Sequence, residues 1–302
     1  MIAPGDGLAS RSPAAWPKPS VRGALWMILS AVLFAIMTAF VRSTSFNLHP
    51  VEIAFFRYLF GLAALAPLLL RAEGIKVTTQ CFGMHFVRAI CGLGTVVSIF
   101  AAVAWMPMAD ATALSFTSPF FVTIGAALFL GEVVLARRWV AVAVGFLGAM
   151  VILRPGMQAL TLPALLAIAS AVFLAGGVLA VKSLSRTETA ATIVLYQSVL
   201  ITAMLLVPAA WVWTTPEASV VAELAVVGIT ATVGHLCYVR AYAVTDTSVV
   251  APFDFFRLIF TALLGFSFFA EHPDLWTWIG AGLIFFATVF GAREQKPADG
   301  PA

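Results

Sequence analysis

The sequence predicts an all-α membrane protein in which ten transmembrane helices form two inverted five-helix repeats. Composition, the shortness of the connections and an internal repetition all point to this fold class. Of 302 residues, 62% are hydrophobic and only 10% are charged, and the mean hydropathy is +1.02. A soluble domain carries about 25% charged residues, so the composition excludes an ordinary water-soluble protein.

Proline, glycine and charged residues divide the chain into ten apolar segments, each near the roughly 20 residues that cross a bilayer. The connections are too short for a soluble catalytic domain. Residues 1–22 are rich in proline and basic residues, which predicts a disordered cytoplasmic tail, and 293–302 form a second cytoplasmic tail. The predicted spans are 23–43, 50–70, 82–105, 109–131, 137–154, 161–182, 191–213, 219–242, 246–270 and 274–292.

The distribution of lysine and arginine predicts the orientation of these spans. With the N-terminus in the cytoplasm, twelve of the 17 cations fall in cytoplasmic segments, whereas only Arg42 and Arg154 fall outside. Cytoplasmic loops are enriched in such cations, so both termini are expected in the cytoplasm. A net charge of +3 spread over loops makes no basic groove, and nucleic acid is therefore not an expected partner.

The chain repeats itself, as residues 23–155 and then as 161–292. At an offset of 140, residues 24–45 match 164–185 with ten of 22 positions identical, and at an offset of 139 six further identities follow, including Phe116 with Phe255. Five helices are an odd number, so the two repeats must lie with opposite orientation in the membrane. Many secondary transporters are built in this way, with the binding site between the repeats near the midplane.

Short motifs occur in both halves in a fixed order. They include VEIAFFRY at 51–58, Arg88 with Gly92, DATALSFTSP at 110–119, GFLG at 145–148, APF at 251–253, EHP at 271–273 and WIGAG at 278–282. Through these motifs, residues 22–292 resemble the EamA-domain branch of the drug/metabolite transporter superfamily.

The resemblance implies a ten-helix inverted-repeat fold, a bacterial inner membrane and a polar cavity lined by both repeats. VEIAFFRY and the AxALSFTSP pattern are similar to S-adenosylmethionine uptake carriers. Exporters of amino acids and other metabolites share much of the same pattern.

Arg257 and Asp254 form the first candidate site, because an ionised side chain at the centre of a span costs about 2.5–3.5 kcal/mol. The two residues lie three positions apart and share one helical face. Either the pair neutralises itself, or Arg257 anchors a substrate carboxylate or phosphate that is released when Asp254 takes up a proton.

A polar stripe on span 82–105 is the second candidate. Arg88, Thr95 and Ser98 recur with His85 and Cys91 at helical spacing, and lipid cannot satisfy such a stripe. The stripe is expected to line a cavity, although Arg88 could also reach the membrane surface as a long side chain.

Arg57 corresponds in the repeat to Gln197. Polar residues at one place in both halves suggest a shared structural or gating role, and the alternative is again a long arginine that reaches the interface.

Two prolines occupy the corresponding fourth helices of the repeats. Pro119 and Pro252 each remove a backbone hydrogen bond and predict a kinked or unwound helix. Ser115 and Ser118 lie beside Pro119 on one side of the span, so their hydroxyl groups are candidate contacts for a substrate.

Two polar and aromatic stripes complete the candidate set. His235 and Tyr238 lie one turn apart in span 219–242, and Trp26 and Ser30 lie one turn apart in span 23–43. His235 either carries a coupled proton or makes an interhelical hydrogen bond, and Trp26 and Ser30 either line the site or pack in the core.

Enzyme motifs are absent from the sequence. It contains no GxxxxGK[ST], no HExxH and no zinc-like spacing of histidine and cysteine, so no cofactor or metal is expected. The prediction is a secondary transporter in the lipid bilayer that moves a small polar metabolite, such as an amino-acid- or nucleoside-derived solute, by alternating access. The alternatives are a metabolite or drug exporter of the same fold and a membrane-embedded enzyme. Ala141, Gly145 and Ala149 form a small-residue face suited to close helix packing or to a homodimer contact.

Overall fold

The structure is a computed structural model that describes residues 19–71, 79, 81–129, 136–153, 161–184, 187–188, 190–244 and 253–292. Within these ranges all regular structure is helical. Pro252, residues 1–18 and residues 293–302 lie outside the described residues. The first helix begins at Pro19, inside the predicted tail 1–22, because proline fits the first turn of a helix.

The helices follow the predicted spans closely. The bounds are α1 (Pro19–Thr44), α2 (Pro50–Arg71), α3 (Phe82–Trp105), α4 (Met108–Ser115), α5 (Ser118–Phe129), α6 (Ala136–Leu153), α7 (Leu162–Leu184), α8 (Ala190–Trp211), α9 (Ala218–Val244), α11 (Phe256–Phe269) and α12 (Leu275–Ala292). Six helical segments of the described chain are long and apolar enough to cross a membrane, and three shorter apolar helices accompany them. The chain is therefore a multi-pass membrane protein.

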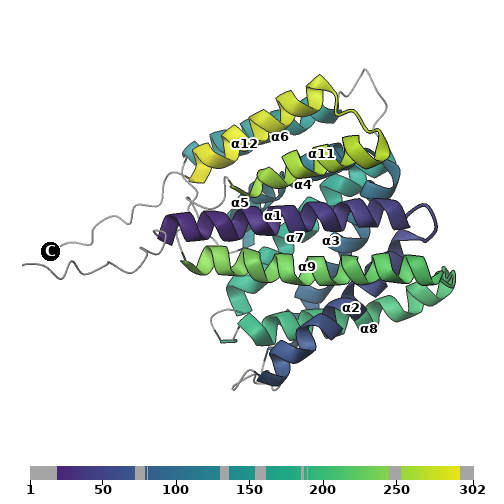
Figure 1. The fold of residues 1–302 in the computed structure, drawn as a ribbon. Coiled ribbons are helices and arrows are strands. Elements are labelled where there is room, and N and C mark those ends of the chain that lie inside the picture. The colour runs from purple at the N-terminus through teal and green to yellow at the C-terminus, as the bar shows by residue number, and fades with distance from the viewer. Residues whose placement is uncertain are drawn as a thin grey trace, which may run out of the picture.

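Helices of the two halves pair in a reciprocal pattern. The first helix of each half, α1 or α7, packs against the third helix of the other half, α9 or α3. The second helices, α2 and α8, pack together at one edge of the bundle, and the fifth helices, α6 and α12, at the opposite edge (Figure 1). Exchanging the halves leaves this pattern unchanged, which indicates an approximate two-fold relation between them.

Corresponding helices of the two halves run in opposite directions. The end of α1 lies at the end of α3, where Arg42 Nη1 donates to the Val103 carbonyl oxygen at 3.0 Å. The chain leaving α7 lies instead near the start of α3, where the Thr79 hydroxyl donates to Glu188 at 2.5 Å. We call the end at which α1 begins and α12 ends the termini end, and the opposite end the distal end (Figure 1).

The predicted span 109–131 is broken into two helices. α4 ends at Ser115 and α5 begins at Ser118, with Pro119 in the first turn of α5, where its missing N–H leaves the Ser115 carbonyl without its usual helical partner. In the second half, a turn at Phe255 precedes α11. Phe116 and Phe255, which correspond in the repeat, stack with ring centroids 4.4 Å apart. The two breaks therefore meet between the halves.

Glycine allows α6 and α12 to pack backbone against backbone. A Cβ at Gly280 would lie 2.5 Å from the Gly148 carbonyl oxygen. The small-residue face of α6 is also covered within the chain, since a Cβ at Gly145 would lie 2.0 Å from the Phe120 ring. This face serves helix packing inside the chain, and a homodimer stays a prediction.

Replacing Gly280 by alanine should destabilise the protein. The new methyl group meets a backbone oxygen that cannot move aside, and overpacking of this kind costs about 1–3 kcal/mol. We expect the unfolding temperature in detergent to fall by several degrees. Gly282→Ala on the same helix is the matched control, because nothing lies within 4 Å of its Cβ and alanine favours a helix. Equal melting of the two variants would contradict the close crossing.

Candidate functional site

A small cavity with polar and apolar residues in its wall lies between α2, α8 and α9, that is, between helices of both halves. Its volume of about 70 Å³ holds roughly five water molecules, so this cavity is too small for a metabolite in this conformation. Three candidate residues, Arg57, Gln197 and His235, lie in its wall. The complete lining is Arg57, Tyr58, Gly61, Leu65, Val194, Gln197, Ser198, Ala231, Thr232, His235 and Leu236.

Gln197 joins Arg88 to this cavity. Arg88 Nη2 donates to Gln197 Oε1 at 2.6 Å, and Arg88 Nη1 donates to the Gly177 carbonyl oxygen of α7 at 3.4 Å. The Gln197 amide fits against α3 because Gly92 has no side chain, since a Cβ there would lie 2.7 Å from Gln197 Nε2. Arg88 is 8% exposed, and its side chain therefore contacts protein rather than lipid.

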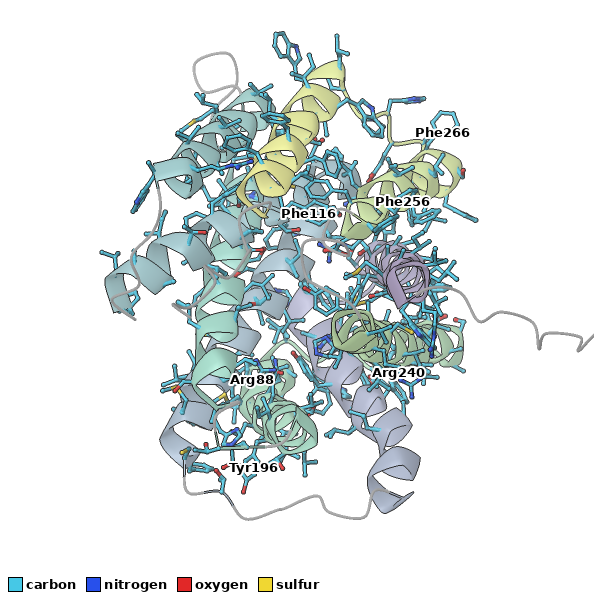
Figure 2. The ribbon with its side chains drawn as sticks, turned by 90° about the vertical axis from the view of Figure 1, so that its left-hand side faces the viewer. Arg88, Phe116, Tyr196, Arg240, Phe256 and Phe266 are labelled. Atoms are coloured by element: carbon cyan, nitrogen blue, oxygen red, sulfur yellow. The ribbon has the colours of Figure 1, made fainter. Side chains whose placement is uncertain are left out.

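The polar stripe of α3 faces the second half of the chain. His85 is fully buried, its ring stacks on Tyr196 of α8 with centroids 4.5 Å apart, and its Nε2 lies 4.0 Å from Glu188. Figure 2 shows Arg88 and Tyr196 on the same side of the bundle. Ser98 is also buried. The stripe therefore faces other helices, but the two ring nitrogens of His85 have no hydrogen-bond partner, and no residue of the stripe lines the α2–α8–α9 cavity.

Other hydroxyl groups of the candidate set bond to their own helices. Thr95 donates to the Cys91 carbonyl oxygen at 2.8 Å, and Ser115 donates to that of Thr112 at 2.7 Å. Ser118 is half-buried at the start of α5. None of Thr95, Ser98, Ser115 and Ser118 lines the α2–α8–α9 cavity.

Arg257 and Asp254 lie in a second group, beside the helix breaks. Arg257 Nη2 is 4.0 Å from Asp254 Oδ2, and the two side chains are 24% and 19% exposed. The guanidinium carbon also lies 4.6 Å from the centroid of the Phe116 ring. Arg257 thus sits in the first turn of α11, where the two halves meet, and is held by a long ion pair and an aromatic face.

Helix α9 lies between the two groups, and the remaining candidates lie on α9 or on the neighbouring α1. Ser30 of α1 donates to the Gly234 carbonyl oxygen at 2.9 Å, next to His235 in the cavity wall. The rings of His235 and Tyr238 are parallel, with centroids 6.2 Å apart. Trp26 lies under the guanidinium of Arg240 at 5.3 Å. The structure therefore brings these candidates together where α1 packs on α9, but not into one cavity.

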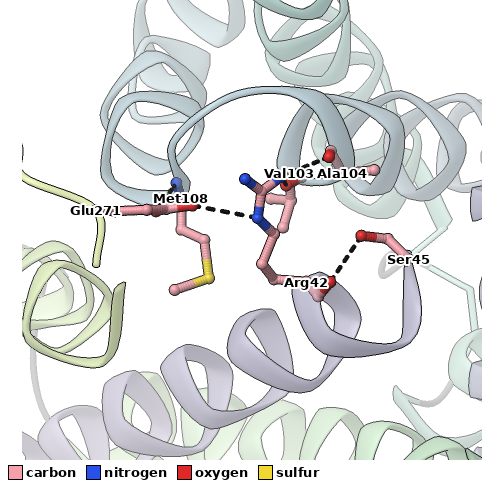
Figure 3. A network of polar contacts seen from close by, with 6 residues as sticks. All are labelled: Arg42, Ser45, Val103, Ala104, Met108 and Glu271. Atoms are coloured by element: carbon pink, nitrogen blue, oxygen red, sulfur yellow. Dashed lines mark hydrogen bonds and ion pairs between the residues drawn. The ribbon is translucent and has the colours of Figure 1, made fainter. Parts of the chain in front are cut away.

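A network of polar contacts that was not predicted from the sequence lies at the distal end (Figure 3). Arg42 Nε of α1 lies 3.2 Å from Glu271 Oε1 in the loop between α11 and α12, and Glu271 Oε2 accepts the Met108 amide hydrogen bond at 2.8 Å. Arg42 also donates to the carbonyl oxygens of Val103 and Ala104. A charged residue near a predicted span end gives no signal of such a partner, because the contact joins residues far apart in the sequence.

Further distal contacts also join the halves. Thr277 donates to Asp110 Oδ1 at 2.6 Å, and Glu52, which is fully buried, accepts the Thr214 amide hydrogen bond at 3.2 Å. Burial raises the pKa of Glu271 above its ordinary value; the Met108 amide and Arg42 act against this shift, and Asp110 adds to it. Polar contacts between the two halves therefore gather at the distal end.

Known proteins resemble this chain over nearly its full length. A riboflavin transporter of Rhizobium johnstonii is 34% identical over 292 residues, covering 93% of this chain and 96% of that protein. The pseudopaline exporter CntI of Pseudomonas aeruginosa is 32% identical, covering 91% and 97%. An S-adenosylmethionine uptake transporter of Rickettsia prowazekii is 29% identical, covering 92% and 95%. All three are named transporters rather than enzymes.

The fold and the two halves are matched as well. A solved crystal structure with 18% identical residues superimposes with a TM-score of 0.64, covering 93% of this chain and 98% of the other. The EamA-like transporter family matches residues 21–154 and, a second time, residues 161–292. With both halves matched, this chain belongs to the EamA-like transporter family.

Proposed function

We propose that this protein is a secondary transporter that moves a small polar metabolite by alternating access. It would cross a bacterial inner membrane ten times, with both termini in the cytoplasm. The observation that carries the proposal is the cavity wall, because Arg57 and Gln197 correspond in the repeat and line one cavity. Carriers built from inverted repeats bind their solute at this interface.

The solute would contact both clusters of candidate residues, the one at the α2–α8–α9 cavity and the one around Arg257 and Asp254. In the cavity group we place Arg57 and Gln197 as gating or structural residues beside His235. In the second group, the 4.0 Å separation of Arg257 from Asp254 leaves the guanidinium able to exchange this carboxylate for one on the solute. The remaining proposed contacts are Arg88, Thr95, Ser98, Ser115, Ser118, Tyr238, Trp26 and Ser30, with Pro119 and Pro252 as helix-breaking residues.

The names of the relatives suggest which solutes to examine. They name riboflavin, pseudopaline and S-adenosylmethionine, which are all small-molecule solutes. We propose a solute of this kind for this chain. Export rather than uptake is the alternative, favoured by the 32% identity to the pseudopaline exporter over 91% of this chain.

The Arg42–Glu271 contact would act as the closure of the distal end. It joins the first helix of one half to the loop after the fourth helix of the other. At the repeat offsets, Arg42 corresponds to Lys182 and Glu271 to Glu132. The sequence therefore supplies a second cation and acid at equivalent places in the other half, although both side chains lie outside the described residues. Alternating access requires such a closure at each end in turn.

Counterflow in proteoliposomes tests the transport function. Vesicles loaded with unlabelled riboflavin, S-adenosylmethionine or an amino acid should accumulate the same labelled solute transiently for at least one of these compounds. A pH gradient added to the assay reports proton coupling. Metal-dependent chemical turnover of the solute without counterflow would favour the membrane-embedded enzyme instead.

Replacing Arg257 by alanine should abolish transport of an anionic or zwitterionic solute. The variant loses the cation that would hold the solute's carboxylate or phosphate, while membrane insertion and expression stay unchanged. Initial counterflow rates measure the effect. Arg137→Ala is the control, because Arg137 lies over Phe290 at the termini end. Unchanged kinetics in Arg257→Ala would remove the anchoring role.

The distal closure should become more stable as the pH falls. The raised pKa of Glu271 means that its carboxyl group holds a proton more firmly when buried than when solvated, where its pKa is about 4.3. The closed form is therefore favoured as the pH falls through the raised pKa, and this stabilisation is lost as the pH rises through it. Spin labels at Asn47 and Leu275, both exposed, would report the closed fraction by their distance distribution.

Two variants of Glu271 test whether this residue causes the pH dependence. Glu271→Gln keeps an acceptor for the Met108 amide without charge, so the distal end should stay closed at every pH. Glu271→Ala leaves the Met108 amide without its acceptor and Arg42 without its counter-charge, so the open fraction should rise. An unaltered pH dependence in Glu271→Gln would assign the titration to another group.

A further inference from the structure

We propose that the α2–α8–α9 cavity selects for negatively charged or oxygen-rich solutes and against cations, with Arg57 and Arg88 as its anchors. This inference rests on the proposed transport function and gives it a substrate class. The sequence singles out Arg257 as the anchor for an anion. The geometry points to two further cations, Arg57 and Arg88, on the other side of α9.

Both guanidinium groups lie around the same small cavity. Arg57 lines it directly, and Arg88 reaches it through Gln197, whose Oε1 accepts its hydrogen bond at 2.6 Å. The imidazole of His235 also lies in the cavity wall. Two cations and an imidazole are thus found in or next to one small cavity.

Among the described residues, no carboxylate forms an ion pair with Arg57 or Arg88. The ion pairs of the described chain are those of Arg42 with Glu271, His85 with Glu188, and Arg257 with Asp254. Arg57 lies over the ring of Tyr58 at 4.3 Å. Two positive charges thus remain without a counter-charge among the described residues.

The partners that are present satisfy Arg88 only in part. Gln197 and Gly177 offer neutral oxygens, and the Arg88 Nε atom is buried without a hydrogen-bond partner. Hydrogen bonds in which both groups are ionised are shorter and stronger than those to neutral oxygens. A solute carboxylate, phosphate or polarised carbonyl can therefore replace the Gln197 oxygen with a gain, whereas a cation entering the cavity meets only repulsion.

Two matched pairs of probes test this selectivity on the purified full-length protein. Flavin mononucleotide differs from riboflavin by a phosphate group, and S-adenosylmethionine differs from S-adenosylhomocysteine by the methyl group that makes its sulfur cationic. We expect the more negative member of each pair to bind at least tenfold more tightly, as measured by the shift of the unfolding temperature with probe concentration. Equal or stronger binding of S-adenosylmethionine than of S-adenosylhomocysteine, or no binding of any probe, overturns the proposal.

Gln197→Glu introduces a negative charge beside Arg88 with almost no change of shape. The new carboxylate pairs with Arg88 and removes the free positive charge, so the preference within each pair should shrink to less than twofold. Arg57→Lys keeps the charge and should retain the preference, and Arg137→Gln at the termini end should leave it unchanged. If Gln197→Glu folds with its preference intact, the anchoring role is wrong.

The outcomes separate this inference from the transport proposal. Counterflow with the reverse charge preference would leave a transporter but contradict the cationic site. Binding with the expected preference and no counterflow of any bound probe would leave the site but contradict transport.

Discussion

The cost of an unsatisfied ionised group inside a membrane determines how this bundle is organised. An arginine at bilayer depth must find protein oxygens, aromatic faces or water, because lipid offers none. Arg88 meets Gln197 and Gly177, and Arg257 meets Asp254 and Phe116. The partners of Arg88 come from the other half of the chain, and Arg257 lies where the two halves meet. The polar groups therefore collect between the halves, and the outward faces of the helices can stay apolar.

The repetition of the chain explains why the same interface holds both structural and functional groups. Residues that correspond in the two halves meet there: Phe116 stacks on Phe255, and Arg57 and Gln197 share a cavity wall. The correspondence is not complete, since Ser115 and Ser118 occupy the places that Asp254 and Arg257 hold in the second half. The fold supplies a near-symmetric frame, whereas the charges that would recognise a solute differ between its sides.

Sequence alone predicted the helices well and their partners poorly. Hydrophobic length and punctuation placed most helix ends within a few residues, and Pro119 marked the broken fourth helix. Periodicity showed that the stripe with His85 and Arg88 must face protein, but not that Gln197 would accept a hydrogen bond from Arg88. The Arg42–Glu271 contact and the buried Glu52 went unrecognised, because a local pattern gives no information on contacts made across the two halves. The candidate residues also divide into two groups around α9, which no spacing rule could show.

Transport by alternating access requires that the two halves lie in opposite orientations in one membrane and enclose a shared polar site. Ala136 and Leu275 correspond in the repeat and are both exposed at the starts of α6 and α12. Single cysteines at these positions, in a protein whose native cysteines are replaced, can be labelled with a membrane-impermeant thiol reagent in oriented vesicles. We expect labelling of Leu275→Cys from outside and of Ala136→Cys only from the cytoplasmic side. Labelling of both from the same side would contradict it.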